Sequence, residues 1–128
     1  MTVQEAIERA DAILPGKSVP AGTDPRWQSI IEVGEFILSE PDAVWTFAAR
    51  WGCHSDPDLR AAIATCLLEH LLEHHFGRLF PLVERLALTD KRFADTFLQC
   101  WSFGQSTSLT NDPRLRALRE RLLGPSAA

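Results

Sequence analysis

Apolar residues recur at helical spacing along most of the chain. The stretch 57–75 shows this most clearly, because Leu, Ile, Ala and Cys cover most of its helical wheel and leave the polar residues in one arc. A helix so apolar is expected at the centre of the fold, with Leu67 and Leu71 buried. Strand signals are nearly absent, since the chain has no sustained period-two alternation, no Asn-Gly turn and no tyrosine.

Short local motifs mark the expected helix boundaries. Asp followed by Pro supplies a side-chain acceptor for the first free amides and then a residue whose φ is already helical, and this pair begins at Asp24, Asp56 and Asp112. Three glycines that directly follow an aromatic residue are expected to end helices in the left-handed conformation: Gly52, Gly77 and Gly104. These marks predict an all-α protein of seven helices, at residues 3–14, 25–38, 41–51, 57–75, 78–88, 90–103 and 113–122.

The helix starts also repeat along the chain. Asp24, Asp56 and Asp90 are 32 and 34 residues apart, and each opens a helix, a short turn and a second helix. A constant period of this kind predicts repeat units that bury their apolar faces by stacking on one another. The predicted units are 25–51, 57–88 and 90–122.

One unit has a recognisable pattern. Residues 56–68, Asp-Pro-Asp-Leu-Arg-Ala-Ala-Ile-Ala-Thr-Cys-Leu-Leu, resemble the HEAT repeat, in which an Asp-capped turn leads into a helix with Leu or Val, Arg, Ala and Leu at helical spacing; residues 111–116 echo its opening. The resemblance implies a short α-solenoid of about three antiparallel helix pairs, with a binding surface formed by equivalent helices. We expect a single domain over 1–128, in which residues 1–22 form a loosely attached helix and linker.

Length and composition set further bounds. With 128 residues and 45% hydrophobic side chains, the chain can bury a core without disulfides or metal. Cys53, Cys66 and Cys100 are odd in number and widely spaced, which indicates reduced thiols. The N-terminus lacks the basic start and apolar run of a signal peptide, and no apolar stretch approaches the roughly 18 residues that cross a bilayer. We therefore expect a cytoplasmic protein with no membrane partner and no cofactor.

The net charge of −4 disfavours a general nucleic-acid binder, because Lys and Arg contacts to phosphate supply most non-specific affinity. The charge is uneven, with net values of −4 over residues 1–50, −2 over 51–88 and +2 over 89–128. Two interpretations stay open: ordinary surface variation, or an electrostatically polar molecule suited to an oriented partner.

One short motif raises the question of a metal. His70-x-x-Glu73-His74 matches the H-x-x-E-H string of inverzincin proteases, and histidines four residues apart can share a metal on one helical face. The helical wheel, however, places Glu73 on the polar face and both histidines in the apolar arc. We therefore expect no metal site, while a small metal-dependent hydrolase using His70, Glu73 and His74 remains an alternative.

Four residues are the candidate binding residues. Trp51, Asp56 and Arg60 lie around the predicted turn between the first two units, and Trp101 lies near the predicted end of a helix. Trp and Arg are enriched among binding hot spots. The predicted function is a non-enzymatic protein–protein interaction module, as an adaptor or an immunity-type binding protein. The alternative is a nucleic-acid-binding helical repeat, because the DNA-alkylation-repair glycosylases, a related helical-repeat family, grip duplexes with Trp, Asp and Arg.

Overall fold

The structure, a computed structural model, describes residues 1–16 and 24–124. All regular secondary structure in these residues is helical, which confirms the all-α class. The elements are α1 (Val3–Ile13), α2 (Pro25–Gly34), α3 (Pro41–Trp51), α4 (Pro57–Ile63), a π-helical turn (Ala64–Leu68, hereafter the π-turn), α5 (Glu69–Thr89), α6 (Lys91–Leu98), a short 3-10 helix (Gly104–Thr107) and α7 (Asn111–Leu123). None of these helices is long and apolar enough to cross a membrane.

Three of the helix starts are confirmed in atomic detail. The Asp24 carboxylate accepts a hydrogen bond from the Arg26 amide, that of Asp56 from the Asp58 amide, and that of Asp90 from the Phe93 amide, each at 2.9 Å. Each carboxylate thus satisfies one backbone N–H that has no partner within its helix. The start at Asp112 is misplaced by two residues, because α7 already begins at Asn111.

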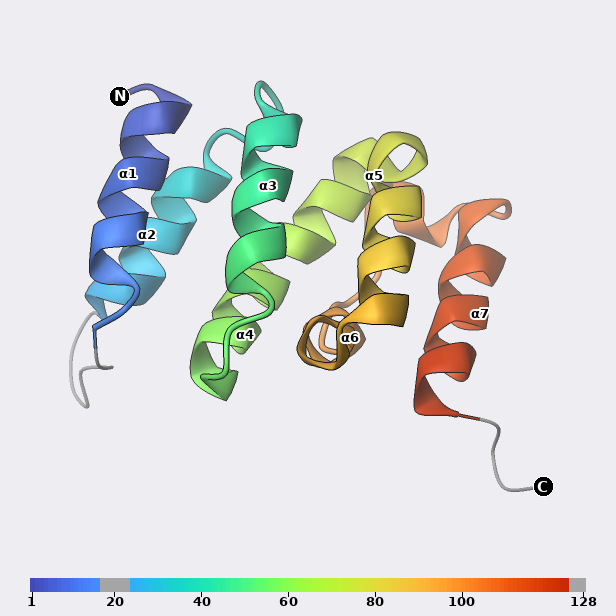
Figure 1. The fold of residues 1–128 in the computed structure, drawn as a ribbon. Coiled ribbons are helices and arrows are strands. Elements are labelled where there is room, and N and C mark those ends of the chain that lie inside the picture. Colours follow the sequence, from blue (N-terminus) through green and yellow to red (C-terminus); the bar gives the residue numbers. More distant parts are fainter. Residues whose placement is uncertain (17–23, 125–128) are drawn as a thin grey trace.

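The prediction of seven separate helices is wrong. Helical structure extends over α4, the π-turn and α5 from Pro57 to Thr89, across a single residue of non-helical φ and ψ, so the described residues contain six helices. The expected boundary near residue 76 exists instead as a kink at His75 (φ −138°, ψ 40°), where the chain turns back on itself (Figure 1). Gly77 lies within α5 and ends no helix.

Side chains from other elements stabilise this kink. The Phe76 amide donates a hydrogen bond to Gln105 Oε1 at 2.8 Å, and Gln105 Nε2 donates to the His74 carbonyl at 2.8 Å. One glutamine side chain therefore satisfies backbone groups on both sides of the kink, where the regular ladder is interrupted. A ring nitrogen of His75 lies 2.8 Å from the Ile37 carbonyl, which ties the kink to the turn that follows α2.

The predicted third unit also differs from its expected form. Its first helix ends at Leu98 rather than at residue 103, and a non-helical segment, 99–103, leads to the 3-10 helix. Gly104 does have a positive φ of 50°, but it lies beyond the end of α6. A Cβ atom at Gly104 would lie 2.7 Å from Glu73 Cγ, so the close approach of this segment to α5 requires glycine.

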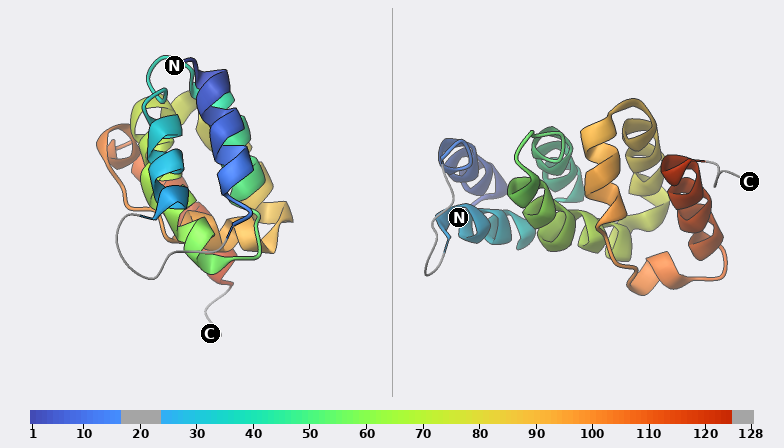
Figure 2. Two further views of the ribbon diagram at one scale, coloured as in Figure 1. Left: turned by 90° about the vertical axis from the view of Figure 1, so that its left-hand side faces the viewer. Right: turned by 90° about the horizontal axis from the view of Figure 1, so that it is seen from below.

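The helices form two layers in a row (Figures 1 and 2). One layer contains α1, α3, the second part of α5, and α7. The other contains α2 and the continuous helix through α4 and the first part of α5. Helix α6 is seen nearly end-on in Figure 1 and from the side in Figure 2, so it crosses its neighbours steeply. Helices α1 and α7 lie at opposite ends of the row.

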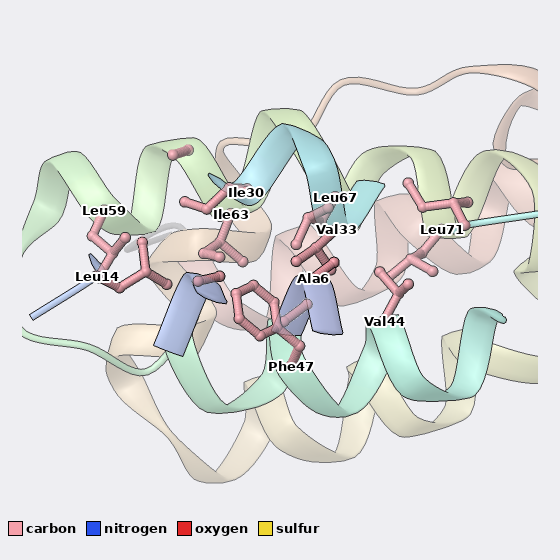
Figure 3. Packing of buried hydrophobic residues seen from close by; sticks show 14 of the residues in the cluster. Ala6, Leu14, Ile30, Val33, Val44, Phe47, Leu59, Ile63, Leu67 and Leu71 are labelled. Atoms are coloured by element: carbon pink, nitrogen blue, oxygen red, sulfur yellow. The ribbon is translucent and has the colours of Figure 1, made fainter. Parts of the chain in front are cut away.

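Two apolar clusters lie between the layers, and the continuous helix contributes to both. Leu67 and Leu71 are fully buried in the first cluster, as expected, together with residues of α1, α2 and α3 (Figure 3). Leu68 and Leu72 belong to the second cluster, with residues of α6 and α7. The continuous helix is therefore the centre of the fold, because each side of it packs into a different half of the core.

Helix α1 packs on α2 and α3. Ala6, Ala10 and Leu14 are buried in the first cluster, and Thr2 caps the helix by a reciprocal pair of hydrogen bonds with Glu5. Residues 17–22 of the expected linker lie outside the described residues.

Candidate functional site

The turn between α3 and α4 brings three of the predicted binding residues together. The Trp51 indole N–H donates a hydrogen bond to Asp11 Oδ1 at 2.8 Å. Arg60 Nη1 donates to the carbonyl oxygens of His54 (2.9 Å) and Ser55 (3.0 Å). The indole N–H of Trp51 and Nη1 of Arg60 therefore donate their hydrogen bonds to other groups of this chain.

Asp56 is also engaged within the fold. While one oxygen caps α4, its Oδ2 accepts a hydrogen bond from Arg26 Nη1 at 2.8 Å. Arg26 Nη2 donates to Asp58 Oδ2 at 2.9 Å, and the arginine side chain is only 3% exposed. Hydrogen bonding to Arg26 lowers the pKa of Asp56, and the same bond raises the pKa of Arg26. Arg26 thus joins the starts of α2 and α4.

This role of Arg26 was not predicted from the sequence. A signal was present, because a cation in the first turn of a helix opposes the helix dipole and therefore calls for a nearby carboxylate. Two carboxylates, Asp56 and Asp58, stand at the equivalent position of the next predicted unit. Their contact with Arg26 follows from the packing of α2 beside α4.

Trp101 lies apart from the other three candidates. Its backbone N–H donates a hydrogen bond to Glu69 Oε2 at 2.8 Å, while its side chain is 73% exposed. It borders a hollow of about 460 Å³ together with Cys100 and Arg119. The four predicted residues therefore belong to two places, one internally bonded and one open to solvent.

The motif His70-x-x-Glu73-His74 has a different geometry from the one expected. Glu73 Oε1 lies 2.8 Å from His70 Nδ1, to which it is hydrogen-bonded, and 3.4 Å from His74 Nε2. The expectation that the wheel separates Glu73 from both histidines is therefore wrong, because Glu73 lies between them. Among residues 1–16 and 24–124, no three His, Cys, Asp or Glu side chains are placed to hold one metal ion.

The thiols of the described residues are unpaired with one another. Burial raises the pKa of Cys53 to about 11 and also raises the pKa values of Cys66 and Cys100. The thiolate, which is the reactive form of cysteine, is therefore disfavoured at all three positions.

An open groove lies between the end of α2 and the first part of α5, and we call it the α2–α5 groove. Its volume is about 550 Å³. One wall comes from α2 and the turn that follows it, and the other from the π-turn and α5; the lining residues are Ile31, Gly34, Glu35, Ile37, Leu38, Thr65, Cys66, His70 and His74. On the first wall, Ile31 is 46% and Leu38 is 68% exposed.

The base of the groove is closely packed. A Cβ atom at Gly34 would lie 3.2 Å from Leu67 Cδ2 and 3.4 Å from the Cys66 carbonyl oxygen, so glycine lets α2 approach the π-turn. Single π-helical turns occur frequently at functional sites. On the far rim, the Phe103 ring stacks on His70, with 5.8 Å between ring centroids and 13° between planes. Phe103 therefore extends the apolar surface beyond the histidine.

The charge around the groove is negative. No Lys or Arg is among its described lining residues, whereas Glu35 lines it and is exposed. Glu35 forms no ion pair with any residue in the described part of the chain. Glu73, whose carboxylate lies within 3.4 Å of both lining histidines, adds a second acidic group beside the groove.

The arginines of α7 are largely engaged within the fold. Arg114 lies over the Phe76 and Phe80 rings, Arg116 pairs with Asp112, and Arg119 donates a hydrogen bond to the Cys100 carbonyl at 3.1 Å. The contacts of Arg114 and Arg119 hold α7 on the end of the row, whereas the pair of Arg116 and Asp112 lies within α7.

Comparison of the chain with protein families, with curated proteins and with solved structures finds no match. Ile31, Leu38 and Phe103 were likewise not predicted from the sequence as binding residues. The available signal was the spacing of Ile31 and Leu38, seven residues apart and hence on one face of the helix predicted over 25–38.

Proposed function

We propose that this protein is a non-enzymatic protein-binding module, built as a short HEAT-like stack of helix pairs. The two-layered row and the capped starts at Asp24, Asp56 and Asp90 support such a stack. In a stack, equivalent helices line a continuous surface that is well suited to binding.

The observation that carries the proposal is the α2–α5 groove. Ile31 and Leu38 expose large aliphatic side chains on one wall, and Phe103 continues the apolar surface past His70. Exposed apolar surface with a polar rim is typical of protein interaction sites, since an isolated protein gains nothing from leaving it in water. Trp101, whose backbone N–H is bonded to Glu69 next to His70 in the chain, supplies a further exposed aromatic side chain.

The residues of the α3–α4 turn take a structural role in this proposal. Trp51, Asp56 and Arg60 use their hydrogen-bonding groups to join α1, α2, α3 and α4. A partner would have to compete with these internal bonds, whereas the aliphatic side chains of Ile31 and Leu38 have no internal polar partner to lose.

Neither alternative function has an observation in its favour. His70 and His74 share Glu73 as a neighbour and are not arranged as two ligands with an adjacent base. Of the arginines on α7 that a nucleic-acid surface would use, Arg114 and Arg119 contact other parts of the fold at Phe76, Phe80 and Cys100, and Arg116 pairs with Asp112 of the same helix.

Site-specific photo-crosslinking in cells tests the proposal. A photoreactive amino acid is placed at Leu38, and in a second variant at Leu123, which is similarly exposed (73%) but lies at the far end of the row. We expect a discrete crosslinked protein from Leu38 that is absent from Leu123 and is lost when Ile31→Asp is added. Equal crosslinking from both positions, or none from Leu38, would contradict the assignment of the groove.

A further inference from the structure

The chemistry of the α2–α5 groove points to the class of partner. We propose that its occupant is an amphipathic helix of another protein that carries Lys or Arg beside its apolar face, with Glu35 as the residue that selects the positive charge. This inference rests on the proposed function, because it takes the groove as the binding surface.

The length of the groove fits a helix. On the second wall the lining residues run from Thr65 to His74, nine residues further along the π-turn and α5, which at the helical rise of about 1.5 Å per residue is about 13 Å. This wall therefore runs for between two and three helical turns. An inserted helix presents apolar side chains at i, i+3, i+4 and i+7 over a comparable length.

The backbone of the groove walls offers few free groups to an extended peptide. The second wall is helical, and the first is helical to Gly34 and then forms a turn, in which the Phe36 and Ile37 amides donate to the carbonyls of Val33 and Gly34. No described residue lies in a strand that an extended peptide could join. Recognition in this groove must therefore depend on side chains. Among the common modes of peptide recognition, an amphipathic helix laid in an apolar groove meets that condition.

The groove is more open than a typical pocket for a small ligand. Pockets for small ligands bury most of the ligand surface, commonly 70 to 90%. Here Leu38 on the rim is itself 68% exposed, so a small molecule beside it would remain largely in water. A helix covers the rim as well as the base and buries Ile31 and Leu38 together.

The negative charge of the groove wall favours a partner with basic side chains. Glu35 stands on the groove wall between Ile31 and Leu38 in the chain and makes no ion pair within the described residues, and no described cation lines the groove. Residues 1–50, which include this wall, carry a net charge of −4. A basic flank on the partner is attracted to this surface, and an acidic flank is repelled.

Synthetic peptides of about four helical turns provide the probes. The first carries Leu at i, i+3, i+4 and i+7 and Lys at the flanking positions, the second replaces each Lys with Glu, and the third scrambles the first so that no apolar face remains. Fluorescence anisotropy at physiological ionic strength measures their affinities. We expect the Lys peptide to bind at least about tenfold more tightly than either of the others.

Two leucine variants separate specific binding from simple charge attraction. Leu38→Asp and Leu123→Asp add the same negative charge at similarly exposed positions (68% and 73%). Non-specific attraction of a cationic peptide would strengthen in both. We expect Leu38→Asp to weaken binding of the Lys peptide by about tenfold or more and Leu123→Asp to leave it unchanged or slightly stronger.

Glu35→Gln tests the charge selection. The ion pair between Glu35 and a lysine of the peptide would be exposed to water. We therefore expect this variant to weaken binding of the Lys peptide about two- to fivefold and to reduce the difference in affinity between the Lys and Glu peptides. Glu120→Gln, an exposed glutamate on α7, is the matched control and should change neither affinity.

Several results would overturn the inference. Equal binding of the Lys and Glu peptides, or equal effects of Leu38→Asp and Leu123→Asp, would contradict it. Self-association that Leu38→Asp abolishes would assign the groove to a second copy of the chain. Binding of an apolar dye that Leu38→Asp abolishes, without peptide binding, would assign it to a small ligand. If Leu38 crosslinks a partner in cells but no Lys peptide binds, the helix is wrong and the proposed function stands; if both fail, both are wrong.

Discussion

The α3–α4 turn and the α2–α5 groove differ in the kinds of side chain that they contain and in how those side chains are engaged. At the turn, Trp51, Asp56 and Arg60 each bond to another part of the chain. At the groove, Ile31 and Leu38 expose aliphatic surface, with no equivalent internal contact for most of it. Residue types common in binding sites are thus a poor guide alone, because the same side chains also hold a fold together.

The positions of the two regions explain the contrast. Asp56 lies where the starts of α2 and α4 meet, and Arg26 forms ion pairs there with the carboxylates of both Asp56 and Asp58. The groove lies near the other end of the same helices, above the π-turn, where the walls stay apart and leave about 550 Å³ of open space. Variants in each region should therefore affect different quantities, stability at the turn and affinity at the groove.

Arg26→Ala should have the largest effect on stability. It removes a nearly fully buried guanidinium and two charged hydrogen bonds, to Asp56 at 2.8 Å and to Asp58 at 2.9 Å. Because both carboxylates keep some access to water, we expect a loss of about 2 to 3 kcal/mol in the free energy of unfolding. Chemical denaturation measures it. Arg9→Ala, which removes an exposed ion pair to Glu32, is the control and should cost less than about 1 kcal/mol.

Asp56→Asn should lower stability by a smaller amount that depends on pH. Asn still caps α4, but the ion pair with Arg26 is lost, and we expect about 1 to 2 kcal/mol at neutral pH. The bond from Arg26 holds the pKa of Asp56 below its ordinary value of 3.8. The carboxylate therefore stabilises the fold above that value, and its contribution is lost as pH falls through the lower, folded-state pKa.

Denaturation of both proteins across this pH range provides the measurement. The difference between wild type and Asp56→Asn should stay constant at neutral pH and shrink below about pH 3.8. A difference that does not change with pH would mean that the ion pair with Arg26 contributes nothing to folding.

Trp51→Phe should cost about 1 kcal/mol, because it removes the indole hydrogen bond to Asp11 while keeping an aromatic ring. Trp101→Phe is the matched substitution at the exposed tryptophan, and its stability should stay within about 0.5 kcal/mol of wild type. Thermal denaturation of the two variants measures which substitution lowers stability more. The reverse order would place Trp51, and not Trp101, on an open surface.

Leu38→Ser should have the smallest effect on stability, within about 0.5 kcal/mol, because that side chain is largely in water already. Partner or peptide affinity measured on the same sample should fall. If the unfolding midpoint dropped in step with affinity, Leu38 would be part of the core instead of a binding surface.

Local sequence was sufficient for several features of the fold. Asp24, Asp56 and Asp90 were identified as helix caps because a cap depends only on a side chain and the amides two or three residues further on. The burial of Leu67 and Leu71 followed from helical periodicity, which places them on the inward face of a central helix.

The remaining features depended on contacts between distant parts of the chain. The kink at His75 relies on Gln105, and the course of segment 99–103 relies on the bond from the Trp101 amide to Glu69. The groove itself is the space left where α2 meets the π-turn at Gly34. Local propensity cannot specify such features, because each depends on which partner the packing of the helices brings within reach of a polar group or an apolar face.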